Sequence, residues 1–293
     1  MEPYSKITFN SHEKFSDKET LQQVTYQMID IIKKYCEPIS LYCFGVQNRS
    51  SFSNTLFTNE ELPQNSSWHF YLLLISDRLR SNSTANLMDL LEKDSVGRIS
   101  VTLICYSPTQ IKSSNNEHLH FFAKVIQSGW LVYGKPYELA KLNLTNLPDL
   151  DFEGITKYSV TRIEVAQDLI KLISHSDSPV IASTLIHTVI EQLCIGMLYA
   201  FLYYHPNHFH LNFLLKLCSL FSSAPDQFFL QNAGYSETLQ KMLNTSRHDL
   251  RFRNTDIYSK NDLNVLKSIC IGFSEALIPC IEERLNELKI QTK

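Results

Sequence analysis

The sequence has little glycine and no strong compositional bias. Only 8 of the 293 residues are Gly, 44% are hydrophobic and 19% are charged. This composition excludes collagen-like, low-complexity and intrinsically disordered chains, and it supplies enough apolar side chains for a packed core. Because a chain of this length exceeds the usual size of one hydrophobic core, we expect two domains.

An excess of basic residues is also absent. The chain has 27 Lys and Arg against 30 Asp and Glu, a formal net charge of -3 at pH 7. Such a balance gives no overall attraction to nucleic acid or to an anionic membrane. RNA binding therefore has no support from the net charge, and any site for a polyanion must be a local cluster of basic residues.

Signatures of disulfides, secretion and membrane insertion are missing as well. The seven Cys residues are odd in number, widely spaced and form no C-x-x-C pair, which favours reduced core thiols over disulfides or a zinc site. Residues 1–10 lack the basic start and apolar core of a signal peptide. The most apolar run, 193–204, is too short to cross a bilayer and predicts a buried helix. We therefore expect a cytoplasmic protein without membrane attachment.

The first half of the chain alternates helical and strand-like patterns. Apolar residues at helical spacing predict helices, and short, nearly continuous apolar runs predict strands. The predicted helices cover about 16–35, 84–93 and 117–127, and the predicted strands cover 39–45, 69–76, 98–107 and 129–134. The Ser- and Asn-rich stretch 46–67 predicts a long loop. This alternation is typical of an α/β domain with a small mixed sheet.

The second half contains only helical patterns. The predicted helices cover about 154–174, 178–204, 210–221, 236–252 and 259–290, and Pro279 is expected to kink the last of them. We place the boundary between two domains, 1–148 and 149–293, in the Pro-containing stretch that separates the two patterns. The fold class expected for the whole chain is α+β with a second, all-α domain that forms a helical bundle.

Histidine is concentrated in two places. His205, His208 and His210 lie within six residues and could gather around a metal, but no carboxylate or Cys lies nearby at ligand spacing. A polar turn between helices is therefore the favoured interpretation. His118 and His120 are two residues apart on a predicted helix, so they do not face one another, and both are expected to be surface or rim groups.

His187 and Glu191 form a different kind of pair. They lie four residues apart on the predicted central helix and therefore share a face, where the carboxylate could fix the tautomer of the imidazole. The same pairing also stabilises the interior of a helical bundle, and the structural role is favoured for the pair taken alone.

The segment SRHDLRFRN is the most concentrated basic stretch. Arg247 and Arg251 are spaced one helical turn apart, and Arg253 follows closely. Guanidinium groups suit bidentate contacts to phosphate, so a nucleotide or an RNA backbone is a reasonable ligand. Alternatively, the arginines complement the macrodipole at the end of a helix and pair with Asp249 or Asp256. Both interpretations fit the spacing.

Taken together, these features resemble a minimal nucleotidyltransferase-like domain fused to a HEPN domain (higher eukaryotes and prokaryotes nucleotide-binding). The resemblance is clearest in HTVIEQLCIGMLYAFLYYHPNHFHLNFLLKLC, with a His and a Glu on one helix face, and in LNTSRHDLRF before the final helix. It implies a HEPN-like bundle in the second half, with a surface that contacts a phosphorylated ligand. The residues implied at that surface are Arg247, Asp249, Arg251, Arg253, His187 and Glu191.

The first half resembles the nucleotidyltransferase layout but lacks its chemistry. The family uses a Gly-Ser step, paired carboxylates on the second strand and a third acid on a later strand to hold two magnesium ions. In this sequence Gly45 is followed by Val46, the paired positions are His69 and Tyr71, and the later strand RISVTLICYS carries no acid. We therefore expect a degenerate pocket around Gly45, His69 and Tyr71, with no metal and no cofactor.

Three functional hypotheses follow. The leading one is a protein that binds a nucleotide or another phosphorylated ligand without transforming it, because the HEPN ribonuclease spacing of Arg and His is absent too. The second is a homodimeric protein-interaction or antitoxin-like regulatory module with no small ligand. The third is a nucleotidyltransferase with unusual metal ligands, for example His69 with Glu60 or Glu61.

Overall fold

The fold was analysed in a computed structural model, which describes residues 18–51, 65–77, 83–230, 236–246, 249–250 and 258–291. The chain divides into two compact units. The first, called the sheet unit, comprises 1–115 and 122–147, and the second, called the helical unit, comprises 116–121 and 148–293. The described strands all lie in the sheet unit, so the predicted mixed α/β organisation with a small mixed sheet is confirmed.

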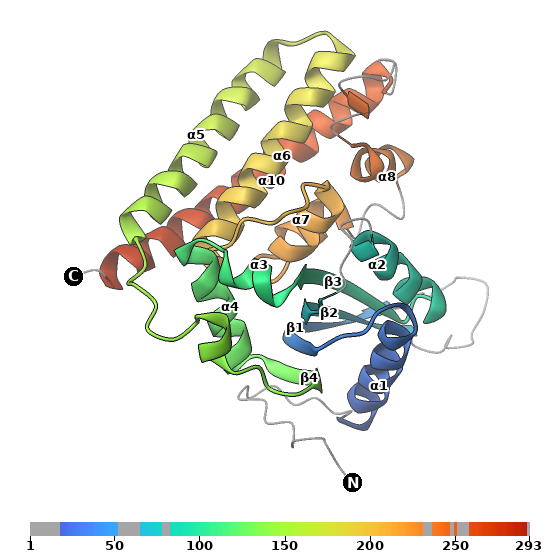
Figure 1. The fold of residues 1–293 in the computed structure, drawn as a ribbon. Coiled ribbons are helices and arrows are strands. Elements are labelled where there is room, and N and C mark those ends of the chain that lie inside the picture. Colours follow the sequence, from blue (N-terminus) through green and yellow to red (C-terminus); the bar gives the residue numbers. More distant parts are fainter. Residues whose placement is uncertain are drawn as a thin grey trace. The chain divides into compact units, whose positions relative to one another are not determined.

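Four strands form the sheet, in the order β3-β2-β1-β4 (Figure 1). β1 pairs antiparallel with β2 on one side and with β4 on the other, whereas β2 and β3 are parallel. A parallel pair needs a crossover connection, which here contains α2. The strands are β1 (Ser40–Ser51), β2 (Asn65–Ile75), β3 (Ile99–Tyr106) and β4 (Trp130–Gly134), and the crossover helix is α2 (Ser83–Asp94).

The hairpin of β1 and β2 is longer than the sequence predicts. The predicted loop 46–67 is wrong at both ends, because β1 continues to Ser51 and β2 begins at Asn65, while 52–64 lies outside the described residues. The outer part of the ladder pairs polar residues, for example Arg49 with Ser67. Backbone hydrogen bonds hold such a ladder without apolar side chains, so its composition gives no strand signal.

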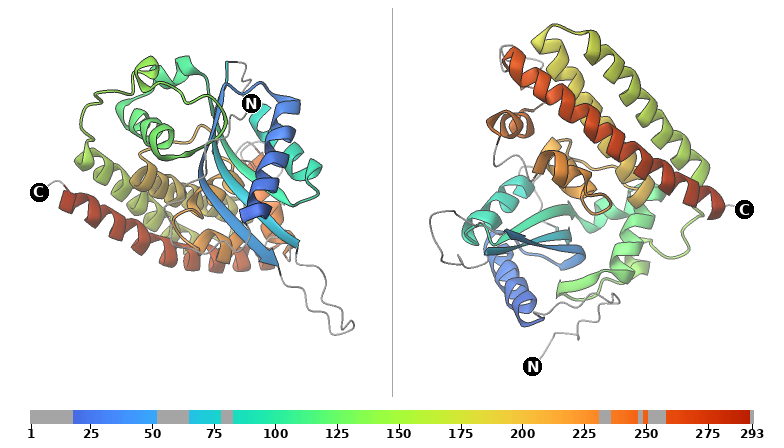
Figure 2. Two further views of the ribbon diagram at one scale, coloured as in Figure 1. Left: turned by 90° about the horizontal axis from the view of Figure 1, so that it is seen from below. Right: turned by 180° about the vertical axis from the view of Figure 1, so that it is seen from behind.

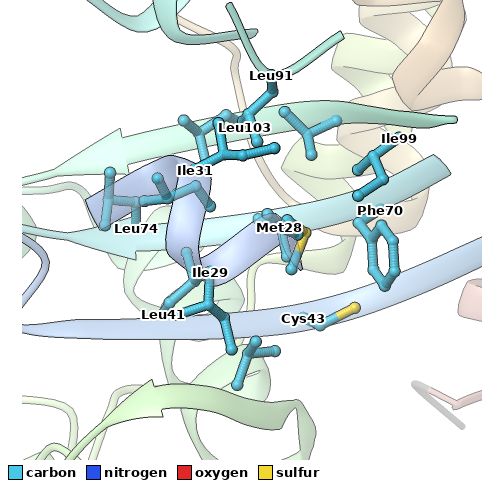
Figure 3. Packing of buried hydrophobic residues seen from close by; sticks show 14 of the residues in the cluster. Met28, Ile29, Ile31, Leu41, Cys43, Phe70, Leu74, Leu91, Ile99 and Leu103 are labelled. Carbon is cyan, nitrogen blue, oxygen red and sulfur yellow. The ribbon is translucent and has the colours of Figure 1, made fainter. Parts of the chain in front are cut away.

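One face of the sheet packs against α1 (Lys18–Tyr35) and α2. Alternate residues of β2, including Phe70 and Leu74, point into this layer, where Met28 of α1 and Leu91 of α2 are fully buried (Figure 3). Burying each large apolar side chain contributes about 1.5–3 kcal/mol. This layer is the core of the sheet unit, and it leaves the other alternate residues of β2 for the opposite face.

Short helical elements complete the sheet unit. Ser107 caps α3 (Pro108–Lys112) in a capping box with Gln110. α4 (Asn116–Ser128) begins in the helical unit and ends in the sheet unit, and η1 (Leu139–Leu142) follows β4. The sequence predicted α4 but neither α3 nor η1, since these are too short to show periodicity.

Three long helices, α5, α6 and α10, pack side by side in the helical unit (Figures 1 and 2). Every residue of α6 from 189 to 200 is buried, so the helix predicted at 178–204 is central to the bundle. The long helices are α5 (Phe152–His175), α6 (Pro179–Leu202) and α10 (Lys260–Gln291), and the shorter elements are α7 (Leu211–Cys218), η2 (Asp226–Leu230) and α8 (Glu237–Asn244).

One detail of the bundle differs from the prediction. The helix predicted at 236–252 stops at Asn244, because Thr245 adopts an extended conformation with φ -79° and ψ 124°. α10 agrees with the predicted extent 259–290 and contains Pro279, and the kink expected there remains a prediction. By length and mean hydropathy, α6 and α10 could each cross a membrane, but 78% of the most apolar window of α6 is buried within the protein, as in a core helix.

Candidate functional site

The predicted nucleotidyltransferase-like positions do lie together on the sheet. Gly45 is paired with Tyr71 across β1 and β2, directly after a register shift that begins at Cys43. The rings of His69 and Tyr71 meet edge to face with their centroids 4.7 Å apart. Both side chains are buried, with exposed fractions of 2% and 0%.

Hydrogen bonds within the sheet occupy these side chains. His69 Nδ1 lies 2.7 Å from the hydroxyl of Ser100, and its Nε2 lies 2.8 Å from the hydroxyl of Thr102. The hydroxyl of Tyr71 donates to Oε1 of Gln47 at 3.1 Å. Because hydroxyls engage both ring nitrogens, neither nitrogen is directed at a metal ion. This network ties β2 to β3 and engages the polar atoms of His69 and Tyr71.

Metal binding finds no support in the part of the chain that the structure describes. No group of three or more His, Cys, Asp or Glu side chains there could hold a metal ion. Glu60 and Glu61, the predicted unusual ligands, lie outside the described residues. The histidines after α6 do not converge, because the ring of His205 stacks on Tyr199 while His208 contacts the ring of Phe213.

His187 and Glu191 form a buried pair on α6, as their spacing predicted. Nδ1 of His187 lies 3.9 Å from Oε2 of Glu191, and each side chain is 3% exposed. The other ring nitrogen of His187, Nε2, donates to the backbone carbonyl of Thr245 at 3.3 Å. The pair therefore contacts the residue that directly precedes the arginine segment, defined as residues 246–257.

Asp249 has a local structural role at the start of this segment. Its carboxylate accepts hydrogen bonds from the hydroxyl and the backbone N–H of Ser246, at 2.7 and 3.3 Å. In return, the hydroxyl of Ser246 accepts from the N–H of Asp249 at 3.1 Å. This reciprocal arrangement is a capping box that starts a new helical turn after α8. Arg247, Arg251 and Arg253 lie outside the described residues.

The residues on either side of the arginine segment lie next to each other. The hydroxyl of Thr245 donates to the carbonyl of Lys241 at 2.7 Å, so it accepts from the hydroxyl of Tyr258 at 3.4 Å. Both side chains are buried, and burial raises the pKa of Tyr258. Lys241 Nζ lies 5.5 Å from the centre of the Tyr258 ring. Thr245 and Tyr258, which flank the arginine segment, therefore lie together beside His187.

The bundle also contains a cluster of rings that the sequence did not predict. His205 stacks on Tyr199 with centroids 4.1 Å apart, and Tyr158 of α5 meets both rings edge-on at 4.7 and 4.8 Å. His118 joins the cluster, because its Nε2 accepts the backbone N–H of His205 at 2.9 Å. The residue is half-buried, which agrees with the rim position that the sequence left open for His118. This contact joins residues 87 positions apart, which local spacing cannot reveal.

Both imidazoles of this cluster are shifted toward their neutral forms. Burial, with a smaller contribution from His205, lowers the pKa of His118 to about 4. Burial also lowers the pKa of His205 and raises that of Tyr199 to about 12. Since Nε2 of His118 accepts a hydrogen bond, the neutral ring carries its proton on Nδ1. At neutral pH the cluster therefore presents uncharged rings beside Arg162, which lies over Tyr158.

Comparison of the chain with protein-family models, curated proteins and solved structures finds no match. Two groups of described residues stand out in the helical unit: those that flank the arginine segment, and the ring cluster beside Arg162.

Proposed function

We propose that this protein binds a nucleotide or another phosphorylated ligand without transforming it, at the arginine segment of the helical unit. The observation that supports this function is the contact between the buried His187–Glu191 pair and Thr245. The sheet order and the all-helical second unit are also compatible with the resemblance, in which residues 1–148 are nucleotidyltransferase-like and residues 149–293 are a HEPN-like bundle.

The chemistry of the segment suits phosphate. Arg247, Arg251 and Arg253 supply guanidinium groups, which stay charged and make paired hydrogen bonds to oxyanions. In this proposal Asp249 fixes the first turn of the segment, while His187 and Glu191 anchor its base. A rigid base reduces the ordering cost of binding, since fewer residues must become fixed when the ligand arrives.

The sheet supports binding rather than transfer. A nucleotidyltransferase needs carboxylates to hold two magnesium ions, and the equivalent positions carry His69 and Tyr71. Hydrogen bonds to Ser100, Thr102 and Gln47 engage both side chains. Oxygen ligands for magnesium are therefore not provided at these positions, and we propose that the ligand leaves chemically unchanged.

Thermal unfolding in the presence of nucleotides tests this function. A ligand at about 100 times its dissociation constant adds roughly 2.7 kcal/mol to the stability of the native state, which raises the midpoint by several degrees. We expect this shift with wild-type protein, with or without magnesium, and its loss in Arg251→Ala. Arg98→Ala is a matched control, because Arg98 is exposed in the sheet unit and its loss should leave the shift intact.

The experiment can refute each part of the proposal. A full shift in Arg251→Ala would show that the ligand binds elsewhere. No shift with any nucleotide or sugar phosphate would refute binding of phosphorylated ligands, and turnover of a nucleoside triphosphate would refute the absence of chemistry.

A second candidate function, a homodimeric or antitoxin-like interaction module, is favoured by the surface of α10. Only 33% of its most apolar window is buried, and Val265 and Ile271 are 51% and 37% exposed. Apolar side chains on a long helix are typical of an interface between two copies. We expect light scattering to give the mass of a dimer at all concentrations and Val265→Asp to give the monomer, whereas a monomeric wild-type protein would argue against this function.

A further inference from the structure

Arg162 of α5 carries a charge that the described fold does not neutralise. Its Nη1 donates to Oε1 of Gln192 at 2.9 Å, and its guanidinium carbon lies 4.8 Å from the centre of the Tyr158 ring. Its Nε is buried and has no hydrogen-bond partner. Among the described residues no carboxylate lies within ion-pairing distance of it. A guanidinium stays protonated, so this partly buried charge would form charge-assisted hydrogen bonds with an anion that reached it.

Arg284 of α10 provides an internal comparison. It also has a buried Nε without a partner and also lies over an aromatic ring, that of Phe201. However, its Nη1 pairs with the carboxylate of Glu287 at 2.8 Å, and its Nη2 donates to the hydroxyl of Tyr203 at 3.2 Å. The fold therefore supplies an anion to Arg284 but not to Arg162.

Other polar groups without hydrogen-bond partners surround Arg162. Tyr158 contacts Arg162, Tyr199 and His205 through its ring. In the described structure neither the hydroxyls of the two tyrosines nor the imidazole nitrogens of His205 form a hydrogen bond. These groups come from α5, α6 and the residues after α6, so the packing of the bundle brings them together. Convergent polar groups on an aromatic surface are typical of a ligand site.

We propose that Arg162, together with Tyr158, Tyr199 and His205, binds an oxyanion, either the phosphate or the carboxylate group of a small ligand. The guanidinium supplies the charge and at least one free N–H, and the tyrosine hydroxyls donate further hydrogen bonds. Neutral His205 donates from one ring nitrogen. Glu117 and Asp151 lie near enough to raise the pKa of Tyr199, so a small anion of low charge fits better than a polyphosphate. The site uses no residue of the arginine segment.

Calorimetric titration of the full chain with inorganic phosphate, and separately with acetate, tests this site. The titrations use the Arg251→Ala background, so that the arginine segment does not contribute. We expect Arg162→Gln to weaken anion binding at least 10-fold and Tyr158→Phe, which keeps the ring, to weaken it about 3- to 10-fold. Lys157→Ala is the matched control, because Lys157 is the exposed cation five positions before Arg162 and should not affect binding.

Titration with phosphate and with acetate distinguishes the two possible ligand classes, phosphate esters and carboxylates. Binding of phosphate alone identifies a phosphate ester as the ligand, and binding of acetate alone identifies a carboxylate. Binding of neither, or equal affinity in Arg162→Gln and its parent, overturns the site. If circular dichroism shows that Arg162→Gln does not fold, Tyr158→Phe decides, and unchanged affinity in that variant overturns the site. None of these outcomes depends on nucleotide binding at Arg251.

Discussion

Replacing Phe273 with alanine is expected to lower the free energy of unfolding by about 3–5 kcal/mol. Phe273 of α10 is completely buried, and its ring meets that of Phe229 edge-on with centroids 5.0 Å apart. The substitution removes apolar surface from the core, loses the ring contact and leaves a cavity that the helices cannot fully close. Phe228, whose ring lies 6.4 Å from that of Phe273, does not fill this space without moving.

Thermal unfolding followed by circular dichroism at 222 nm measures this loss. The midpoint should fall by roughly 10 °C, since 1 kcal/mol corresponds to about 2–4 °C in a unit of this size. Phe209→Ala is the control, because Phe209 is 49% exposed and its truncation should change stability by less than about 0.5 kcal/mol. Equal effects of the two substitutions would contradict the position of Phe273 at the centre of the bundle.

Replacing Gly134 with alanine is expected to destabilise the sheet unit by about 3 kcal/mol or more. Gly134 ends β4 with φ +90°, a conformation that L-residues rarely adopt. An added Cβ would also collide with the carbonyl oxygen of Ile39 and lie 3.0 Å from the Cα of Ser40. Because both obstacles belong to the backbone of β1 and its approach, the substitution must push the two strands apart.

Gly97 is a control that shows the cost of a positive φ angle alone, without crowding by neighbouring atoms. It has φ +74°, but an added Cβ there meets nothing within 4 Å, so Gly97→Ala should cost only about 1–2 kcal/mol. Chemical denaturation of the two variants measures the difference. Equal losses would show that the approach of β4 to β1 is not as close as described.

The sequence predicted those parts of the fold that depend on local periodicity. The apolar positions Leu21, Met28 and Ile31 repeat at helical spacing, and all three are buried in α1. The apolar runs 69–76 and 193–204 likewise indicated burial, and every residue of 69–76 and of 193–200 is buried. The spacing of apolar residues identifies which side chains must be buried, and for long helices and strands this is enough to predict the element.

Contacts between distant segments could not be predicted in the same way. The sequence around His69 did not indicate that it would hydrogen-bond to Ser100 and Thr102. The sequence around His118 likewise did not indicate its hydrogen bond with the backbone N–H of His205. These partners are chosen by how elements pack, and a single sequence carries no periodic signal for packing. The sequence indicated the arginine segment because its basic residues lie close together along the chain, whereas the residues of the cluster around Arg162 come from separate helices.

The position of β4 in the sheet affects the order in which the chain can fold during synthesis. β1 uses both of its edges, and the strand on its second edge arrives only with Trp130–Gly134. Until then the hairpin of β1 and β2 exposes unpaired backbone groups, which can join other nascent chains. The hydroxyl of Ser40 later donates to the carbonyl of Lys135, directly after β4. Residue 135 must therefore have been synthesised and have left the ribosome before the four-stranded sheet can be completed.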